Sequence, residues 1–179
     1  MNSEKAIVAL LDALNDLSLD YMIVGSLSSN FYGIARSTKD ADVVISLAYS
    51  SVAELARRLD SEFQFDPQVE LELVTSTTKY LFSFREAPFE VEVFLLSDDP
   101  HDRERFLRRQ RATLLGRNAF FPTAEDVIVM KLRWALSRPH GKDVEDVAAV
   151  IAVSGDNLDW QYVFHWCDLH GTRKLLDSI

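Results

Sequence analysis

Cysteine is nearly absent from this sequence: Cys167 is the only one among 179 residues, so no intrachain disulfide can form. A chain without disulfides is typical of a reducing cytoplasm. The chain also has only 6 glycines and 5 prolines, and its aromatic residues are spread along the whole length. Such a composition argues against disorder, because enough apolar surface is available to build a core. We therefore expect a folded, cytoplasmic protein.

Long apolar runs are absent as well. No stretch approaches the about 20 apolar residues that a helix needs to cross a bilayer. The first residues, MNSEKAIVALLDAL, include acidic side chains and lack the basic region and cleavage site of a secretory signal. We expect a soluble protein with no membrane partner.

Positive charge is in deficit, with 19 Lys and Arg against 28 Asp and Glu and a net charge of -9. This balance disfavours a general nucleic-acid binder, which neutralises phosphates with basic side chains. The exception is the segment DRERFLRRQR, residues 102–111. It could bind a nucleic acid, but the interleaved Asp102 and Glu104 favour a solvated helix with internal ion pairs. The histidines near Cys167 lack the spacing of a zinc site.

What the sequence does contain is a strand-rich N-terminal half followed by a mostly helical C-terminal half, which predicts an α+β protein. We expect an α/β core over residues 1–121 and a helical extension over residues 122–179, packed together as one compact unit. Hydrophobic periodicity predicts strands at 19–24, 41–46, 69–75, 79–84 and 89–96, and a hairpin at 112–121. It predicts helices at 3–17, 28–34, 50–60, 99–110, from 123 onward, at 143–153 and at 159–170.

Two carboxylates open the second strand. Asp40 and Asp42 lie two residues apart, and strand side chains alternate faces, so both project from one face. Two like charges on one face favour a cation between them, and Mg²⁺ prefers oxygen ligands. An isolated Asp-x-Asp is more often a turn signature, and Arg36 and Lys39 offer plain countercharges. Both interpretations stay open on these residues alone.

A second acidic pair occurs in the strand FEVEVFLL, where Glu90 and Glu92 share a face. If that face is exposed, both are ordinary polar positions. If this strand neighbours the strand of Asp40 and Asp42, three carboxylates converge, which is enough for one or two Mg²⁺ ions.

The remaining candidates are a turn and two charged helix positions. Gly25-Ser26 lies between a strand and a helix, where glycine allows close backbone approach and a helix N-terminus attracts phosphate. Alone, this dipeptide is a common turn. Lys131 either snorkels from its helix or contacts a nucleotide. Asp143 either caps its helix or contributes to the same site.

In this order, the motifs resemble those of the DNA polymerase β-like nucleotidyltransferase superfamily, and most closely its small bacterial members of the abortive-infection toxin type. The resemblance covers roughly residues 20–152. It rests on four segments: GSLSSNFYGIARSTKDADVVI, VEVFLL, FPTAEDVIVMKL and GKDVEDV.

The resemblance implies a mixed sheet flanked by helices and assigns roles to single residues. It implies that Asp40, Asp42 and Glu92 are the catalytic, metal-binding acids. The family's usual third acid is aspartate, so Glu92 is longer by one methylene. Together with the local chemistry, the resemblance implies these nucleotide-binding residues: Gly25, Ser26, Lys39, Lys131, Lys142 and Asp143.

The activity implied is Mg²⁺- or Mn²⁺-dependent transfer of an NMP from an NTP to a hydroxyl of a nucleic acid or a protein. The toxin half of a toxin–antitoxin pair, with an antitoxin as partner, is a further expectation, and the C-terminal aromatics could serve a homodimer. The alternative is a catalytically degenerate relative that binds a nucleotide or a partner protein. The two differ in whether the three carboxylates converge.

Overall fold

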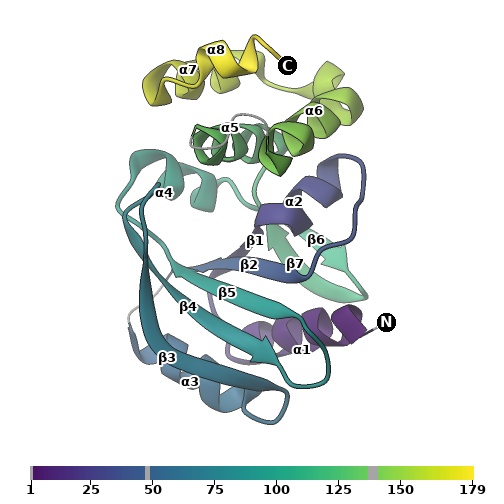
Figure 1. The fold of residues 1–179 in the computed structure, drawn as a ribbon, viewed down its shortest axis with the longest axis vertical. Coiled ribbons are helices and arrows are strands. Elements are labelled where there is room, and N and C mark those ends of the chain that lie inside the picture. Colours follow the sequence, from purple (N-terminus) through teal and green to yellow (C-terminus); the bar gives the residue numbers. More distant parts are fainter. Residues whose placement is uncertain (1, 47–48, 137–140) are drawn as a thin grey trace.

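The computed structural model describes residues 2–46, 49–136 and 141–179 (Figure 1). Its strands are β1 (Tyr21–Val24), β2 (Asp40–Ile45), β3 (Phe63–Glu72), β4 (Thr77–Phe84), β5 (Glu90–Leu95), β6 (Gln110–Leu114) and β7 (Arg117–Phe121). Its helices are α1 (Asn2–Asp16), α2 (Gly25–Tyr32), α3 (Tyr49–Leu59), α4 (Pro100–Leu107), α5 (Ala124–Ala135), α6 (Lys142–Ser154), α7 (Trp160–His170) and α8 (Arg173–Leu176). A short 3₁₀ turn, η1 (Gly155–Asn157), joins α6 to α7.

Five strands form one mixed sheet in the order β1-β2-β5-β4-β3. The central pair, β2 and β5, is parallel, and the other pairs are antiparallel. Strands β6 and β7 form a separate hairpin. Because β2 and β5 run in parallel, their acidic first residues lie side by side at the same end of the sheet, although the two segments are far apart in the sequence.

The two faces of the sheet differ in what covers them. One face carries the odd-numbered apolar residues of β2 and β5 and packs with α1, α3 and the β6–β7 hairpin in the main core. The other face is apolar only in part: Val44 and Phe94 pack with Phe106 of α4. The acidic ends of β2 and β5 lie on this second face, which the apolar cluster leaves uncovered.

The expected α+β fold, with a mixed sheet flanked by helices, is confirmed. The main difference is β3, which was predicted at 69–75 and runs from Phe63 to Glu72. Pro67 interrupts the apolar alternation there, and the pairing with β4 shifts register between Asp66 and Glu70. An edge strand tolerates proline because it has one unpaired side, so the strand continues where the pattern breaks.

The helices α5–α8 lie above the sheet in the view of Figure 1 and share their own apolar cluster. Helix α5 begins as predicted, with Thr123 accepting a hydrogen bond from the Asp126 amide. The C-terminal aromatics pack within this cluster, where Trp166 is buried and Trp160 is partly buried. Helix α8 was not predicted, because four residues are too short to show a helical period.

A buried polar group ties α4 to α5 and α7. His101, fully buried, lies with Nε2 3.2 Å from Asp126 Oδ1, and the Tyr162 hydroxyl donates to the same oxygen at 2.6 Å. The rings of His101 and His170 lie 5.4 Å apart. Burial lowers the pKa of His101, and burial with the nearby Arg133 lowers the pKa of His170 to about 4.

These two histidines should make the fold sensitive to mild acid. A folded-state pKa below the unfolded value of about 6.5 means stability present above pH 6.5 and lost as pH falls towards 4. Because His170 is partly exposed, we expect its share to be about 1 kcal/mol. Urea unfolding at pH 7.5 and pH 4.5 measures this, and His170→Asn should lose less stability over that range than wild type. His165→Asn, at an exposed site on the same helix, is the control, and equal losses in the His170 variant and wild type would contradict the assignment.

Candidate active site

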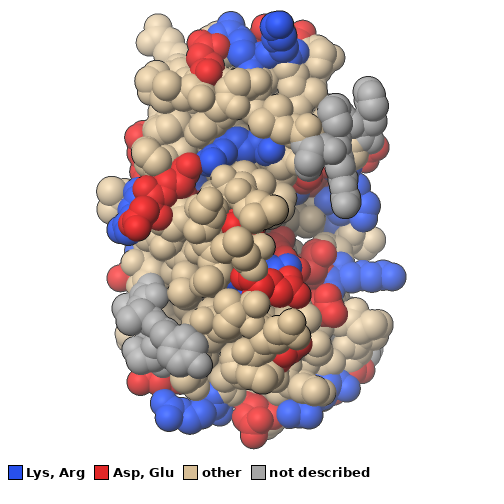
Figure 2. All heavy atoms as spheres, turned by 60° about the vertical axis from the view of Figure 1, so that its left-hand side comes forward, with Lys and Arg blue, Asp and Glu red and all other residues tan. Residues whose placement is uncertain are grey.

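A pocket of about 270 Å³ opens where the acidic ends of β2 and β5 face α5. Figure 2 shows acidic side chains gathered at mid-height of the molecule, beside a hollow in the surface. The sheet and α2 supply one side of the pocket, with Val24, Gly25, Ser26, Ser28, Asp40, Asp42, Val44, Glu92, Phe94 and Leu95. The opposite side comes from the β3–β4 hairpin, α4, α5 and α6, with Glu72, Thr75, Thr77, Asp102, Arg105, Pro122, Val127, Met130, Lys131, Trp134 and Asp143.

Strand register brings the acids together. Asp42 pairs with Glu92 across the parallel strands, and Asp40 pairs with Glu90. All four lie on the same sheet face, because each pair is two residues apart in its strand. Asp42 and Glu92 are partly buried and line the pocket, whereas Glu90 is exposed and is not in the lining. Burial therefore favours Glu92 over Glu90 as the third acid.

Asp42 has a strongly raised pKa. Burial, together with the Glu92 and Asp40 carboxylates, raises the pKa of Asp42 to about 7. Lys131 opposes this shift, but only in part. The three carboxylates therefore carry more negative charge than the nearby lysines offset, which favours the binding of a further cation.

The two flanking acids already have partners. Asp40 accepts a hydrogen bond from Thr38, and Lys79 donates to Glu92 Oε1 at 2.8 Å. Within the described ranges, no three His, Cys, Asp or Glu side chains are arranged so that they could hold a metal ion as they stand. The carboxylate oxygens are of the type that Mg²⁺ prefers, so the donor set fits a hard cation. A cation that takes all three acids needs at least one of these side chains to rotate.

The turn before α2 is shaped by Asp42. Gly25 has φ +60°, and a Cβ built on it would lie 1.8 Å from Asp42 Oδ2. Only glycine therefore lets the backbone pass this close to the carboxylate. Helix α2 starts without a side-chain cap, so its first N–H groups are available to an anion beside Gly25 and Ser26.

A charged network holds the opposite side of the pocket. Lys131 Nζ lies 2.8 Å from Asp143 Oδ1 and 2.9 Å from Asp146 Oδ2. Arg36 donates to both oxygens of Asp146, from Nε to Oδ1 at 2.9 Å and from Nη2 to Oδ2 at 3.0 Å. Its Nη2 also donates to Ser26 Oγ at 3.0 Å. The network links the loop before β2 and the start of α2 to α5 and α6.

Lys131 stays charged in this network. Burial acts to lower the pKa of Lys131, and the Asp143 and Asp146 carboxylates outweigh it and hold the pKa above its ordinary value. Only 11% of its side chain is exposed, so the cation is fixed at the pocket wall and does not simply snorkel into solvent. Asp143 lies in the first turn of α6, but its carboxylate accepts from Lys131.

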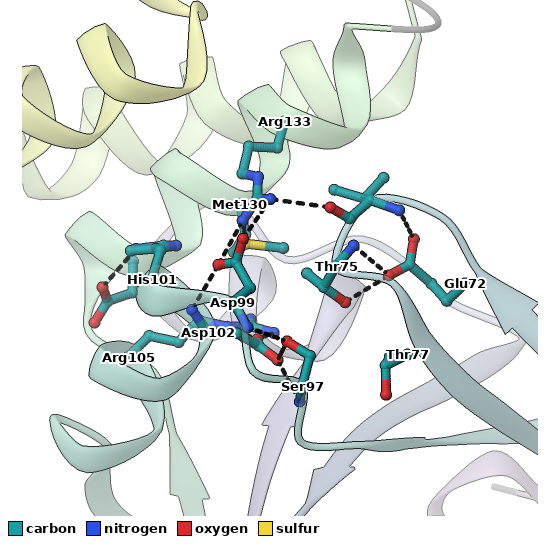
Figure 3. Close-up of polar contacts among 12 residues, drawn as sticks. Glu72, Thr75, Thr77, Ser97, Asp99, His101, Asp102, Arg105, Met130 and Arg133 are labelled. Atoms are coloured by element: carbon teal, nitrogen blue, oxygen red, sulfur yellow. Dashed lines mark hydrogen bonds and ion pairs between the residues drawn. The ribbon is translucent and has the colours of Figure 1, made fainter.

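The part of the pocket wall formed by the tip of the β3–β4 hairpin, α4 and α5, called the far wall here, is held together by hydrogen bonds among its own polar groups (Figure 3). Arg133 binds both oxygens of Asp99, at 3.0 and 2.9 Å, and donates to the Val74 carbonyl at 2.9 Å. Glu72 accepts from the Thr75 amide at 2.8 Å and from its hydroxyl at 2.6 Å. The tip of the β3–β4 hairpin is thereby fastened to α4 and α5, which leaves Met130 and Trp134 as large apolar lining residues.

Not every predicted residue comes to the pocket. Lys39 and Lys142 are exposed and are not among the described lining residues. Sequence reasoning missed Lys79, which reaches the site from β4, and it did not assign Asp146 to Arg36. The signal for Lys79 was absent, because a lysine in a polar strand position is ordinary. Asp146 could have been found, since a buried acid three residues after Asp143 needs a countercharge.

The arginines of residues 102–111 all bind partners within the chain. Arg105 is buried against Asp102, and Arg109 lies 2.7 Å from Asp20. The other three contact Asp98, Asp126 and Asn118. Four of the five arginines therefore have a carboxylate partner, and only Arg111 binds a neutral amide, so most of the positive charge that a nucleic acid would need is balanced within the chain.

No protein-family profile matches the chain, and no curated protein matches its sequence, whereas several solved structures are similar to it in fold. The crystal structure of the antibiotic-resistance factor ANT(2'')-Ia with adenylyl-2''-tobramycin aligns with a TM-score of 0.66 at 14% identity, over 97% of this chain and 99% of that chain. An antigenic nucleotidyltransferase-like protein from Paracoccidioides brasiliensis aligns at 0.59 and 20% identity, over 98% and 90%. Lincomycin-bound LnuA, a lincosamide antibiotic adenylyltransferase, aligns at 0.50 and 11% identity, over 86% and 98%.

The chain therefore has the fold of the DNA polymerase β-like nucleotidyltransferases, as the motifs indicated. The match extends over nearly the whole of both chains, including the helical C-terminal half. None of the helices in the described part of the chain combines the length and apolarity needed to cross a membrane.

Proposed function

We propose that this protein is a nucleotidyltransferase that moves an NMP from an NTP to a hydroxyl group, with a divalent cation. The observation that carries the proposal is the position of Asp42, which the strand register places beside Glu92 in the lining of a pocket that Asp40 also lines. Burial and two neighbouring carboxylates raise the pKa of Asp42 to about 7, and the same pocket is lined by Gly25 and Ser26 at the uncapped start of α2. Carboxylates whose charge the nearby lysines offset only in part, beside an uncapped helix start, suit a metal-bound triphosphate.

The chain's own groups would divide the work. The first N–H groups of α2, at Gly25 and Ser26, would donate to the phosphates. Lys131, fixed by Asp143, would present its charge to the phosphates across the pocket. Asp40, Asp42 and Glu92 would hold Mg²⁺ or Mn²⁺, which, when bound, neutralises charge on the triphosphate and the leaving pyrophosphate. The far wall would hold the acceptor near the sheet and exclude water.

The class of acceptor is inferred from the charge and the lining of the site. A nucleic acid or a protein hydroxyl was expected from the sequence, but the paired arginines of residues 102–111 give no support to a nucleic acid. The neighbouring structures contain adenylyl-2''-tobramycin and lincomycin. A pocket of about 270 Å³ lined by Met130 and Trp134 suits a small hydroxyl-bearing molecule, which we include as an acceptor class.

The test is incubation with each α-labelled NTP and Mg²⁺, in the presence of cellular RNA, of a protein fraction, and of tobramycin or lincomycin. We expect label transfer to one of these fractions by wild type and none by Asp42→Ala. Absence of both transfer and nucleotide binding in wild type would remove the enzyme proposal. Growth arrest on expression, relieved by Asp42→Ala, is the outcome that would support a toxin role, with an antitoxin as partner.

The second candidate is a degenerate relative that binds nucleotide without catalysis. It is favoured by the Lys79–Glu92 pair, since a lysine already neutralises the proposed third metal ligand. Nucleotide binding that survives in Asp42→Ala, together with no transfer by wild type, would support it.

A further inference from the structure

Lys79 is a charged residue that contacts the site and that the sequence motifs do not predict. It projects from β4, one strand beyond the acids, and its ammonium bridges two carboxylates. One is Glu92, at 2.8 Å, and the other is Glu70 on β3, at 2.9 Å. Lys79 is 20% exposed, whereas Glu70 is 57% exposed. The contact with Glu92 is thus the more sheltered of the two.

The Glu92 carboxylate lies between a lysine and a second acid. Lys79 binds Oε1. Its register partner across the parallel strands is Asp42, and the Glu92 carboxylate helps to raise the pKa of Asp42. A glutamate side chain has one more rotatable bond than an aspartate, so it needs an external contact to hold its carboxylate in one place. Lys79 supplies that contact from the neighbouring strand.

We propose that Lys79 is a positioning residue that anchors Glu92 beside Asp42, so that the longer acid can act as the third carboxylate of the site. The inference rests on the proposed function, because it assigns Glu92 a place in the metal and nucleotide site. Lys79 also sets the cation affinity of that site, since a fixed ammonium next to the acids repels a second cation.

Two opposite effects follow from one substitution. Lys79→Met keeps the aliphatic stem and removes the charge and the donor. Without the contact from Lys79, the Glu92 side chain can adopt other rotamers. We expect kcat to fall by about tenfold, because a group needed for the reaction is then misplaced. Losing the ammonium should tighten Mn²⁺ binding to the apo protein, by about threefold to tenfold after allowance for solvent screening. A merely structural lysine would not move these two quantities in opposite directions.

The closing experiment measures both quantities in a set of matched variants. Mn²⁺ affinity is measured by titration calorimetry without nucleotide, and kcat is measured by label transfer. Glu70→Gln removes only the outer ion pair of Lys79 and should match wild type in both. Lys79→Arg keeps a charged donor and should restore most of kcat. In a Glu92→Asp background the shorter acid ends short of Lys79, so adding Lys79→Met should cost little further kcat.

The outcomes separate the two proposals. Tighter Mn²⁺ binding in Lys79→Met, with kcat lowered only where Glu92 is present, is the expected result. If wild type shows no transfer but Mn²⁺ binding still tightens in the variant, the proposed function fails while the role of Lys79 in the cation site stands. If wild type transfers label and Lys79→Met equals it in both kcat and Mn²⁺ affinity, the anchor is overturned. No Mn²⁺ binding by folded wild type overturns it as well.

Discussion

Asp42→Asn is expected to lower NTP-dependent transfer by about 10³-fold or more while raising the stability of the metal-free protein. The loss follows because the amide cannot replace a carboxylate that neutralises a cation. The gain follows because the wild-type carboxylate is buried between Glu92 and Asp40, which raises its pKa to about 7. The ionised Asp42 carboxylate that the proposed reaction needs therefore lowers the stability of the metal-free fold.

The pH dependence of that gain has a definite sign. A folded-state pKa of about 7 against 3.8 unfolded means that the carboxyl costs little below pH 4 and progressively more as pH rises to 7. We expect Asp42→Asn to be more stable than wild type by about 1–3 kcal/mol at pH 8 and nearly equal at about pH 3.5, below the unfolded pKa. Urea unfolding with a chelator present measures the difference.

Glu90→Gln is the matched control for Asp42→Asn. Glu90 lies on the same sheet face and pairs with Asp40, but it is exposed and outside the pocket lining. It should leave transfer unchanged and stability within about 0.5 kcal/mol. Equal effects of the two substitutions on transfer would show that the acidic face acts only through its overall charge, and the assignment of Asp42 would be wrong.

Gly25→Ala is the second substitution for which we expect a large loss of stability and transfer. Its backbone has φ +60°, which costs a residue with a Cβ about 1 kcal/mol or more. The added methyl would also meet Asp42 Oδ2 at 1.8 Å, so either the carboxylate or the turn must move. We expect a loss of about 2–4 kcal/mol in stability and of at least about 10²-fold in transfer.

The control for Gly25→Ala is Gly155→Ala. Gly155 has an ordinary helical φ of -56°, and its added methyl meets only Ile151 Cγ2, at 3.6 Å. It should cost less than about 1 kcal/mol and leave transfer intact. Thermal unfolding and the labelled-NTP assay measure both variants. A Gly25→Ala protein with wild-type stability and transfer would show that the close approach to Asp42 is not needed.

Local chemistry is what the sequence determined by itself. The alternation of β2 placed Asp40 and Asp42 on one face, and the Thr123 cap fixed the start of α5, because both depend on neighbouring residues. The Gly-Ser turn between a strand and a helix was readable for the same reason. The α+β class followed from the order of these local patterns.

Tertiary structure decided everything that depends on which strands are neighbours. The parallel pairing of β2 with β5 puts Glu92 beside Asp42, and the antiparallel pairing of β4 with β5 brings Lys79 to Glu92. The ion pairs of Arg36 and Lys131 with Asp146 likewise join residues about a hundred and about fifteen positions apart, by contacts between α5, α6 and the loop before β2. Strand order and helix docking come from burial summed over the whole core, so no single segment encodes them. The sequence alone therefore yields the acids, whereas the lysine that holds one of them in place is visible only in the folded chain.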